Sequence, residues 1–148
     1  MWRQLLLGIL LGVTAAAHGA DQNQQLLMAA SQGLERMVSD LLAQGADANA
    51  KNANGRPVLV MAAFNGNVRT LRALIGAGAD VNAVDGGGNS ALMEAAAFGH
   101  VDAVAALIYA GADMNLKNAA GSDAMKRAEL GKHQDVIKLL QESGAGSE

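Results

Sequence analysis

Asp47, Asp80 and Asp113 are the side chains whose type and spacing could support chemistry, because they recur at one constant interval along the chain. Two neighbouring carboxylates can act as general acid and base, and a group of them can hold a metal ion. If each aspartate belongs to its own layer of helices, however, neighbouring layers lie roughly 8–10 Å apart, too far to share a proton or a small ion. We therefore expect aspartates that stabilise turns.

Two histidines show the same interval. His100 and His133 are separated by the same step as Asp47 and Asp80, and they could in principle contribute to a metal site. No third ligand accompanies them at a suitable spacing, so we expect a structural role for both.

The sequence contains no motif for a nucleophile or for phosphate binding. It has no cysteine, and no serine lies in a Gly-x-Ser-x-Gly elbow. The Lys-Ser/Thr pair that completes a P-loop does not follow the run Gly86–Gly88, where we expect a tight or flexible turn. The sequence thus predicts no catalytic residue, cofactor or metal ion. A small metal-dependent hydrolase that uses the Asp and His columns is the alternative from another class.

Composition limits the class of protein and its partners. Hydrophobic residues make up 51% of the 148 residues, whereas aromatic residues make up only 3%. A core of Ala, Leu, Val, Ile and Met suits short, closely packed helices. The net charge of −3, from 11 basic and 14 acidic side chains, argues against a nucleic-acid or anionic-membrane partner.

Residues 1–20 have the pattern of a cleavable signal peptide. Arg3 supplies a positive charge, Leu5–Val13 is apolar, and small residues follow. The apolar run through Ala17 is shorter than the roughly 20 residues that span a bilayer, which favours a leader over an uncleaved anchor. We expect cleavage after one of the small residues up to Ala20 and, for a bacterial source, export to the periplasm as a soluble protein.

From Gln22 onward the sequence repeats with a constant period, equal to the step from Leu26 to Leu59. The period is clearest in four columns: Leu26, Leu59, Leu92 and Met125; Ala29, Ala62, Ala95 and Ala128; Leu41, Leu74, Leu107 and Leu140; Gly45, Gly78, Gly111 and Gly144. A spacing kept without insertion indicates one supersecondary element per unit, stacked on its neighbours. We expect these units at residues 22–54, 55–87, 88–120 and 121–146.

Each unit is expected to contain two short helices, as the second unit shows. Residues 58–65 carry the apolar face of the first helix and residues 68–75 that of the second, with Gly66 between them. Leu71 and Leu74 lie on one stripe of the second helix, which predicts that this stripe faces the core. A Gly-Ala-Asp turn then ends the unit, with a glycine that can adopt the left-handed conformation.

The runs Gly45–Ala50, Gly78–Ala83 and Gly111–Asn115 resemble the signature of the ankyrin-repeat family. Gly99–Asp102 is similar to the family's turn between helices, and the resemblance covers essentially the whole chain after the leader. Of the family's Thr-Pro-Leu-His opening, only the leucine position is kept. The resemblance implies an all-α solenoid of about four helix-turn-helix units, with hairpin-like fingers that project at right angles.

The same resemblance implies that a partner protein binds the fingers and the inner-facing surface of the first helices. The candidate partner-binding residues at these positions are Arg56, Met61, Phe64, Asn65, Asn89, Glu94, Phe98, Ser122 and Arg127. Phe64 and Phe98 are the only phenylalanines, and aromatic residues at positions that core packing does not need indicate a binding surface. The alternative is that each covers a neighbouring repeat. Tyr109 is expected on the opposite, second-helix side.

The resemblance implies a non-catalytic protein-binding module, which we expect to be monomeric and to bind no nucleic acid. Roles of similar bacterial proteins include the inhibition of a cognate toxic enzyme and the support of envelope stress defence. A scaffold with several partners is a third interpretation, and all three stay open at this point.

Overall fold

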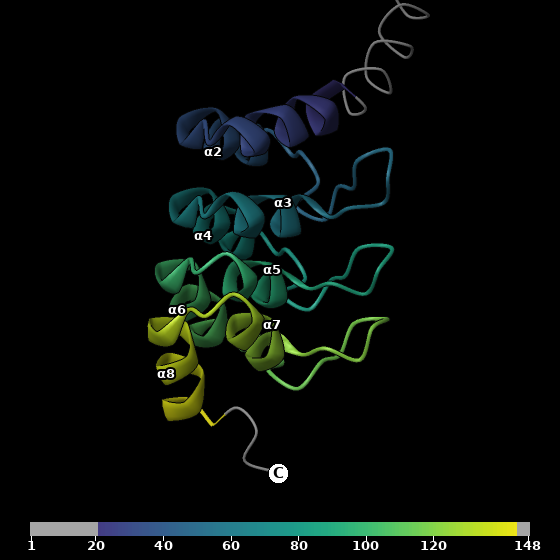
Figure 1. Cartoon of the computed structure of the whole chain (residues 1–148). Helices are drawn as coiled ribbons and strands as arrows, with labels where there is room; N and C mark the ends of the chain where they lie inside the picture. Colours follow the sequence, from purple (N-terminus) through teal and green to yellow (C-terminus); the bar gives the residue numbers. More distant parts are fainter. Residues whose placement is uncertain (1–20, 145–148) are drawn as a thin grey trace, which may run out of the picture.

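The computed structural model describes residues 21–144 as a stack of helix pairs (Figure 1). The signal peptide predicted at residues 1–20 lies outside the described residues. The helices are a segment that includes residues 21–32, α2 (Glu35–Ala43), α3 (Val58–Asn65), α4 (Val68–Gly76), α5 (Ala91–Ala97), α6 (Val101–Tyr109), α7 (Ala124–Leu130) and α8 (Gln134–Glu142). Within residues 21–144, no helix is both long and apolar enough to cross a membrane.

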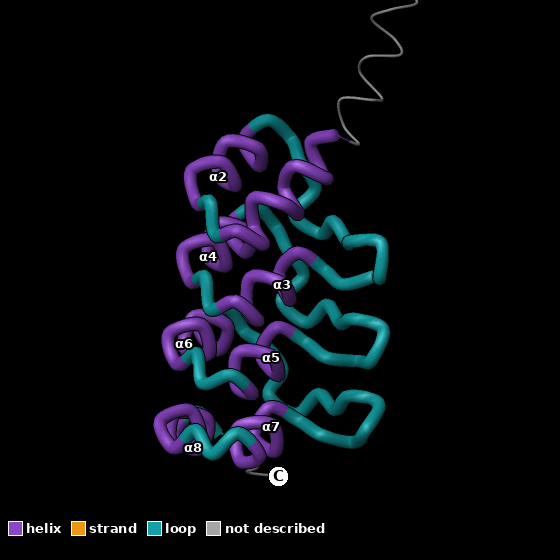
Figure 2. The backbone as a smooth tube through the Cα atoms, turned by 45° about the horizontal axis from the view of Figure 1, so that its top comes forward, coloured by secondary structure: helices purple, strands orange, loops and turns teal. Residues whose placement is uncertain are grey.

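The stack has three rows, which Figure 2 shows side by side. The second helices α2, α4, α6 and α8 form one outer row, the first helices α3, α5 and α7 form the middle row, and loops project beyond them. Within the rows, α5 packs against α3 and α7, and α6 packs against α4 and α8. The all-α repeat solenoid predicted from the sequence is therefore confirmed.

The projecting loops are the expected fingers. We define finger 1 as residues 51–57, finger 2 as residues 84–90 and finger 3 as residues 117–123. Isolated antiparallel bridges close the first two, between Lys51 and Pro57 and between Val84 and Ser90. The fingers extend to the same side of the stack, next to the first helices (Figures 1 and 2).

The core lies between the two rows of helices. The first helices contribute short side chains such as Ala62, Ala63, Ala95 and Ala96, all of which are fully buried. Because alanine is small and favours helix, the neighbouring first helices can approach closely. The first helices also bury larger side chains such as Leu59 and Leu92, and the second helices contribute the leucine stripe, so both rows supply apolar area that holds the layers together.

The first helices begin with different caps. The hydroxyl of Ser90 accepts a hydrogen bond from the backbone N–H of Met93 at 3.2 Å, and a carboxylate oxygen of Asp123 accepts one from Lys126 N–H at 2.8 Å. Such side-chain caps satisfy N–H groups that have no partner within the helix. Ser90 and Asp123 therefore cap α5 and α7, whereas Pro57 at the corresponding position before α3 makes no side-chain cap.

Tight turns join the two helices of a unit. Gly66 has a φ of 70°, and a Cβ at this position would lie 2.6 Å from the ring of His100, so both the conformation and the space favour glycine. The Nε2 of His100 lies 3.0 Å from the carbonyl oxygen of Phe64, and His133 Nε2 lies 2.9 Å from the carbonyl oxygen of Ala97. The structural role predicted for the two histidines is thus confirmed, because each ties its repeat to the previous one.

The last of these turns contains a strained residue. Lys132 occupies the position that is glycine in the earlier turns, and its φ is 58°. A side chain in the left-handed region costs about 1–2 kcal/mol, which a glycine would relieve. Part of that gain is lost again, because glycine also stabilises the unfolded chain by raising its conformational entropy. We expect Lys132→Gly to raise the free energy of unfolding by about 0.5–1 kcal/mol, measured as a higher urea midpoint.

Lys117→Gly is the matched control, because it removes the same charge from an exposed residue in finger 3 that is not among those with positive φ. Its midpoint should stay the same or fall. Equal midpoints for Lys132→Gly and the unaltered protein would contradict the strain argument.

Candidate functional site

The aspartates with the most suggestive spacing serve their own turns. One carboxylate oxygen of Asp80 accepts a hydrogen bond from the N–H of Asn82 at 3.0 Å, and the corresponding bonds of Asp47 and Asp113 are 2.8 and 2.9 Å long. The turn-stabilising role predicted for these residues is confirmed. Among residues 21–144, no three His, Cys, Asp or Glu side chains form a group that could hold a metal ion.

A ladder of asparagines links these turns from repeat to repeat. Asn49 Oδ1 accepts a hydrogen bond from the N–H of Asp80 at 2.7 Å, and Asn82 Oδ1 accepts one from Asp113 at 2.8 Å. Sequence reasoning gave these asparagines no role, although they occupy the same position in neighbouring units, which was a visible signal. The spacing alone does not show that the side-chain oxygen of each asparagine accepts a hydrogen bond from the backbone of the following repeat.

Each finger is held by the side chain of its second residue. Asn52 Oδ1 accepts hydrogen bonds from the N–H groups of Asn54 and Arg56 at 3.0 and 2.9 Å. Asp85 in finger 2 and Asn118 in finger 3 make the equivalent pair of bonds. The fingers are therefore rigid enough to present their remaining side chains in fixed positions.

The two finger-to-finger junctions differ. Fingers 2 and 3 are joined by a backbone bond from Ala119 N–H to Gly87 O at 2.9 Å and by a bond from Asn118 Nδ2 to Asn89 Oδ1 at 2.9 Å. At the junction of fingers 1 and 2, Asp85 and Arg56 take the positions of Asn118 and Asn89, and their side chains lie 3.9 Å apart, beyond the length of a hydrogen bond. A polar cleft of about 360 Å³ opens there, which we call the inter-finger cleft. It is lined by Asn52, Asn54, Arg56, Asp85, Gly86 and Gly87.

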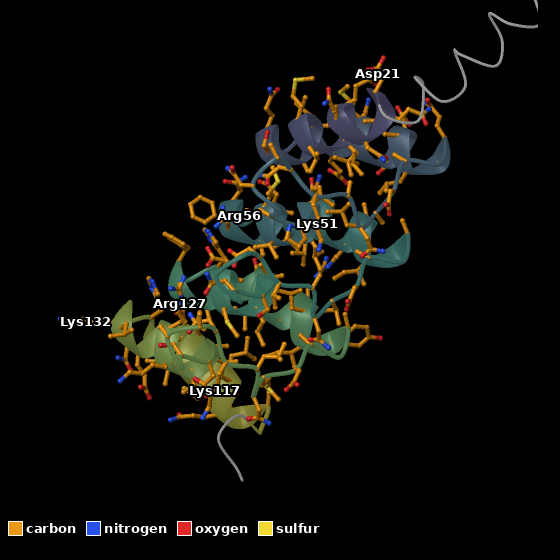
Figure 3. All side chains as sticks on the ribbon, turned by 90° about the vertical axis from the view of Figure 1, so that its right-hand side faces the viewer. Asp21, Lys51, Arg56, Lys117, Arg127 and Lys132 are labelled. Atoms are coloured by element: carbon orange, nitrogen blue, oxygen red, sulfur yellow. The ribbon has the colours of Figure 1, made fainter. Side chains whose placement is uncertain are left out.

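The two phenylalanines form an exposed pair beside this cleft. The ring centroids of Phe64 and Phe98 lie 4.7 Å apart in an edge-to-face arrangement, and the residues are 37% and 48% exposed. The guanidinium of Arg56 lies 5.1 Å from the centroid of Phe64, and the ring of His100 is stacked 6.4 Å from that of Phe98. The two phenylalanines singled out from the sequence therefore lie in contact and form one exposed aromatic patch. Figure 3 looks onto this side of the stack and labels Arg56 and Arg127.

The sequence prediction was wrong about the exposure of Glu94. This side chain was expected on the exposed inner surface, but the residue is only 3% exposed. Its Oε1 accepts a hydrogen bond from Arg127 Nη2 at 3.0 Å, and its Oε2 lies 3.7 Å from Arg56 Nη2. The long side chains of the two arginines reach over it from the neighbouring repeats. Glu94 therefore orients Arg56 and Arg127 and is not itself available to a partner.

The other candidate residues lie on the same side with different accessibility. Met61 is half-buried, whereas Asn65 is exposed and its Nδ2 donates to the carbonyl oxygen of Ser31 at 3.3 Å. Asn89 and Ser122 are half-buried near the bases of fingers 2 and 3, where their N–H groups bond to the side chains of Asp85 and Asn118 opposite them. The structure thus brings together Arg56, Phe64 and Phe98 and leaves the finger-base residues in mainly structural positions.

A second apolar surface lies on the other side of the stack. Tyr109 is 96% exposed at the end of α6, as expected for the second-helix side. It borders an apolar groove of about 600 Å³ between α4 and α6. The other lining residues are Arg72, Ile75, Gly76, Ala105, Ala106 and Ala110. The chain therefore carries two candidate apolar surfaces on opposite rows of helices.

Stacked helix pairs with projecting fingers define a helical repeat protein, a class that offers an extended surface for binding. Residues 26–118 match the family model of ankyrin repeats, in three copies, and the chain belongs to the ankyrin-repeat family. A comparison with curated proteins finds no match. Ankyrin repeats are generic protein–protein interaction modules, and the family is typically non-catalytic. Helices α7 and α8 follow the matched residues and continue the stack.

Proposed function

We propose that this chain is a non-catalytic module that binds another protein through its inner surface. We define the inner surface as the exposed side chains of α3, α5 and α7 together with the three fingers. The observation that carries the proposal is the exposed pair Phe64 and Phe98, in a chain with only 3% aromatic residues. Burial of about half of each ring against a partner would stabilise a complex, because aromatic side chains bring a large apolar area.

The surroundings of the pair favour it over the groove beside Tyr109. Binding hot spots are enriched in aromatic residues and arginine and are surrounded by polar groups that set the orientation of the partner. Phe64 has the guanidinium of Arg56 above it and the exposed amide of Asn65 next to it in the chain. Of the seven residues that line the groove between α4 and α6, four are alanine or glycine, and they include a single aromatic residue, Tyr109, instead of a pair of rings in contact.

We further propose that the module acts in the cell envelope. An inhibitor of a cognate toxic enzyme, an accessory of envelope stress defence and a scaffold are all compatible with one binding surface on a monomer. These roles differ in stoichiometry, because an inhibitor binds a single partner one to one and a scaffold binds several. A small metal-dependent hydrolase is disfavoured by the engagement of the Asp and His columns in turns and repeat contacts.

The test is a comparative pull-down from envelope extract, identified by mass spectrometry. The protein should recover a partner that the Phe64→Ser, Phe98→Ser double variant does not recover and that Tyr109→Ser recovers unchanged. Recovery of the same partner by the double variant but not by Tyr109→Ser would move the binding surface to the second helices and contradict the proposal.

The proposal that the protein is exported depends on the sequence pattern of residues 1–20. This proposal predicts that the mature protein begins near residue 21. A positive end followed by a short apolar run and small residues is what a signal peptidase processes. N-terminal sequencing of the protein from the envelope fraction should find a new terminus between residues 18 and 21. An intact chain recovered from the cytosol would contradict the export proposal without affecting the binding surface.

A further inference from the structure

Arg56 has unused hydrogen-bonding capacity at the mouth of the inter-finger cleft. Its Nη2 lies 3.9 Å from Asp85 Oδ2 and 3.7 Å from Glu94 Oε2, which is within ion-pair range but beyond the length of a hydrogen bond. Within residues 21–144, its guanidinium makes no hydrogen bond, although the side chain is 31% exposed. An arginine has five N–H donors in a planar fork that matches a carboxylate. The donors are therefore available to a ligand.

The two carboxylates next to Arg56 are occupied elsewhere. Asp85 Oδ1 accepts hydrogen bonds from the N–H groups of Gly87 and Asn89, and Glu94 accepts its short bond from Arg127. Asp85 and Glu94 thus hold the guanidinium over the ring of Phe64 without forming hydrogen bonds to its N–H groups. An incoming carboxylate could approach the fork directly, at the shorter distance typical of charge-assisted hydrogen bonds.

The charges of the described residues are divided between the two sides of the stack. The first helices, the fingers and the last inter-helix turn carry the basic residues Lys51, Arg56, Lys117, Lys126, Arg127 and Lys132 and the acidic residues Asp21, Asp85, Glu94, Asp123 and Glu129. The second helices and the turns after them carry the acidic residues Glu35, Asp40, Asp47, Asp80, Asp102, Asp113, Asp135 and Glu142 and the basic residues Arg36, Arg69, Arg72 and Lys138.

On the finger side, exposed basic residues outnumber exposed acidic ones. Lys51, Lys117, Lys126 and Lys132 are exposed, against Asp21 and Glu129, and the side chains of Asp85 and Glu94 are only 12% and 4% exposed. Figure 3 shows Arg56, Arg127 and Lys132 one after another along one edge of this side. An overall acidic protein therefore presents most of the basic residues of the described part on the side that also carries the phenylalanine pair. Such a surface attracts an acidic partner and repels a basic one.

We infer that the partner segment is both acidic and apolar. It places an apolar side chain on Phe64 and Phe98 and an adjacent carboxylate on the guanidinium of Arg56, at the mouth of the inter-finger cleft. The inference rests on the proposed function, because it names the chemistry of the protein that binds the inner surface. Arg56 is then the residue that sets the preference for acidic segments, and the phenylalanine pair supplies the apolar contact.

The test uses short random peptides displayed on phage and selected on the unaltered protein. Selected peptides should carry Asp or Glu within a residue or two of a large apolar side chain. A selected peptide is then synthesised with its acidic residue intact and, in a second version, replaced by the corresponding amide. The protein should bind the acidic version about tenfold more tightly, as one charge-assisted hydrogen bond can provide.

Arg56→Gln should bind both versions about equally, at the affinity of the amide version. Arg69→Gln is the matched control, because Arg69 is an exposed arginine on α4 and its loss changes the net charge by the same amount. This control should keep the tenfold preference. Selection of neutral or basic peptides, or a preference that survives in Arg56→Gln, would overturn the inference.

Asp85→Asn should strengthen binding of the acidic peptide, whereas Arg56→Gln should weaken it. A purely structural role for Arg56 does not predict this gain in affinity. Asparagine already stands at this position in fingers 1 and 3, where its Oδ1 makes the same two bonds, so finger 2 should keep its shape. Without the nearby carboxylate, Arg56 should bind the acidic peptide about twofold to fivefold more tightly. Unchanged or weaker binding of the acidic peptide would count against the inference.

Failure of the inference can be separated from failure of the proposed function. Peptides that lose binding to the Phe64→Ser, Phe98→Ser variant but show no acidic preference contradict only the inference. Selected peptides that bind this variant as well as they bind the unaltered protein contradict the proposed surface. Equal binding of a single-stranded oligonucleotide would show that negative charge suffices, and it would overturn the need for an apolar side chain.

Discussion

Replacing Leu74 or Leu107 by alanine is expected to lower the free energy of unfolding by about 2–5 kcal/mol. Both side chains are fully buried, Leu74 on α4 and Leu107 on α6, in the row where these two helices pack against each other. The smaller side chain leaves a cavity, so the cost includes lost contacts as well as lost burial. Because both lie in internal repeats, their loss also weakens the interfaces on either side. Urea unfolding followed by helical circular dichroism measures the effect.

Asp80→Asn provides the control. Asp80 is exposed, and an asparagine keeps the oxygen that accepts the hydrogen bond from Asn82 N–H. We expect a change below about 0.5 kcal/mol. If both leucine variants unfolded at the same urea concentration as the unaltered protein, the assignment of these residues to the core stripe would be wrong.

The helices could be predicted because their positions depend on patterns that repeat. The segment 58–65 was expected from its apolar run and the glycine that follows, and α3 spans Val58–Asn65. The stripe with Leu71 and Leu74 was expected from the helical period, and both residues are buried. Such features are local or recur in every unit, so one sequence contains several copies of the same evidence.

Contacts that depend on one particular repeat could not be predicted in this way. Glu94 stands in the column of Met61 and Arg127, and the column gives all three the same expected exposure. Its burial results from Arg127 and Arg56, which belong to neighbouring layers, and a column pattern does not show how far such long side chains reach. The inter-finger cleft has a similar origin, because Asp85 and Arg56 stand there, whereas the next junction has the hydrogen-bonded amides of Asn118 and Asn89.

The double change Phe64→Ser, Phe98→Ser is expected to weaken binding of the partner by about 2 kcal/mol or more. The two rings touch edge to face at 4.7 Å and present one continuous apolar patch, so their removal deletes the centre of the proposed contact. The fold should lose less, about 1–2 kcal/mol, because the rings are partly exposed and stabilise the stack mainly through each other. Calorimetric titration with the recovered partner, well below the unfolding transition, measures the affinity.

Tyr109→Ser is the matched control, since it removes an aromatic residue that is even more exposed but lies on α6. It should leave affinity unchanged, because α6 belongs to the outer row of helices, away from the fingers (Figure 2). Unfolding of the double variant at the temperature of the titration would instead identify the two phenylalanines as part of the core. The edge-to-face contact would then be one that holds α3 and α5 together, and the arginine above it would be a cover for the stack and not a group presented to a partner.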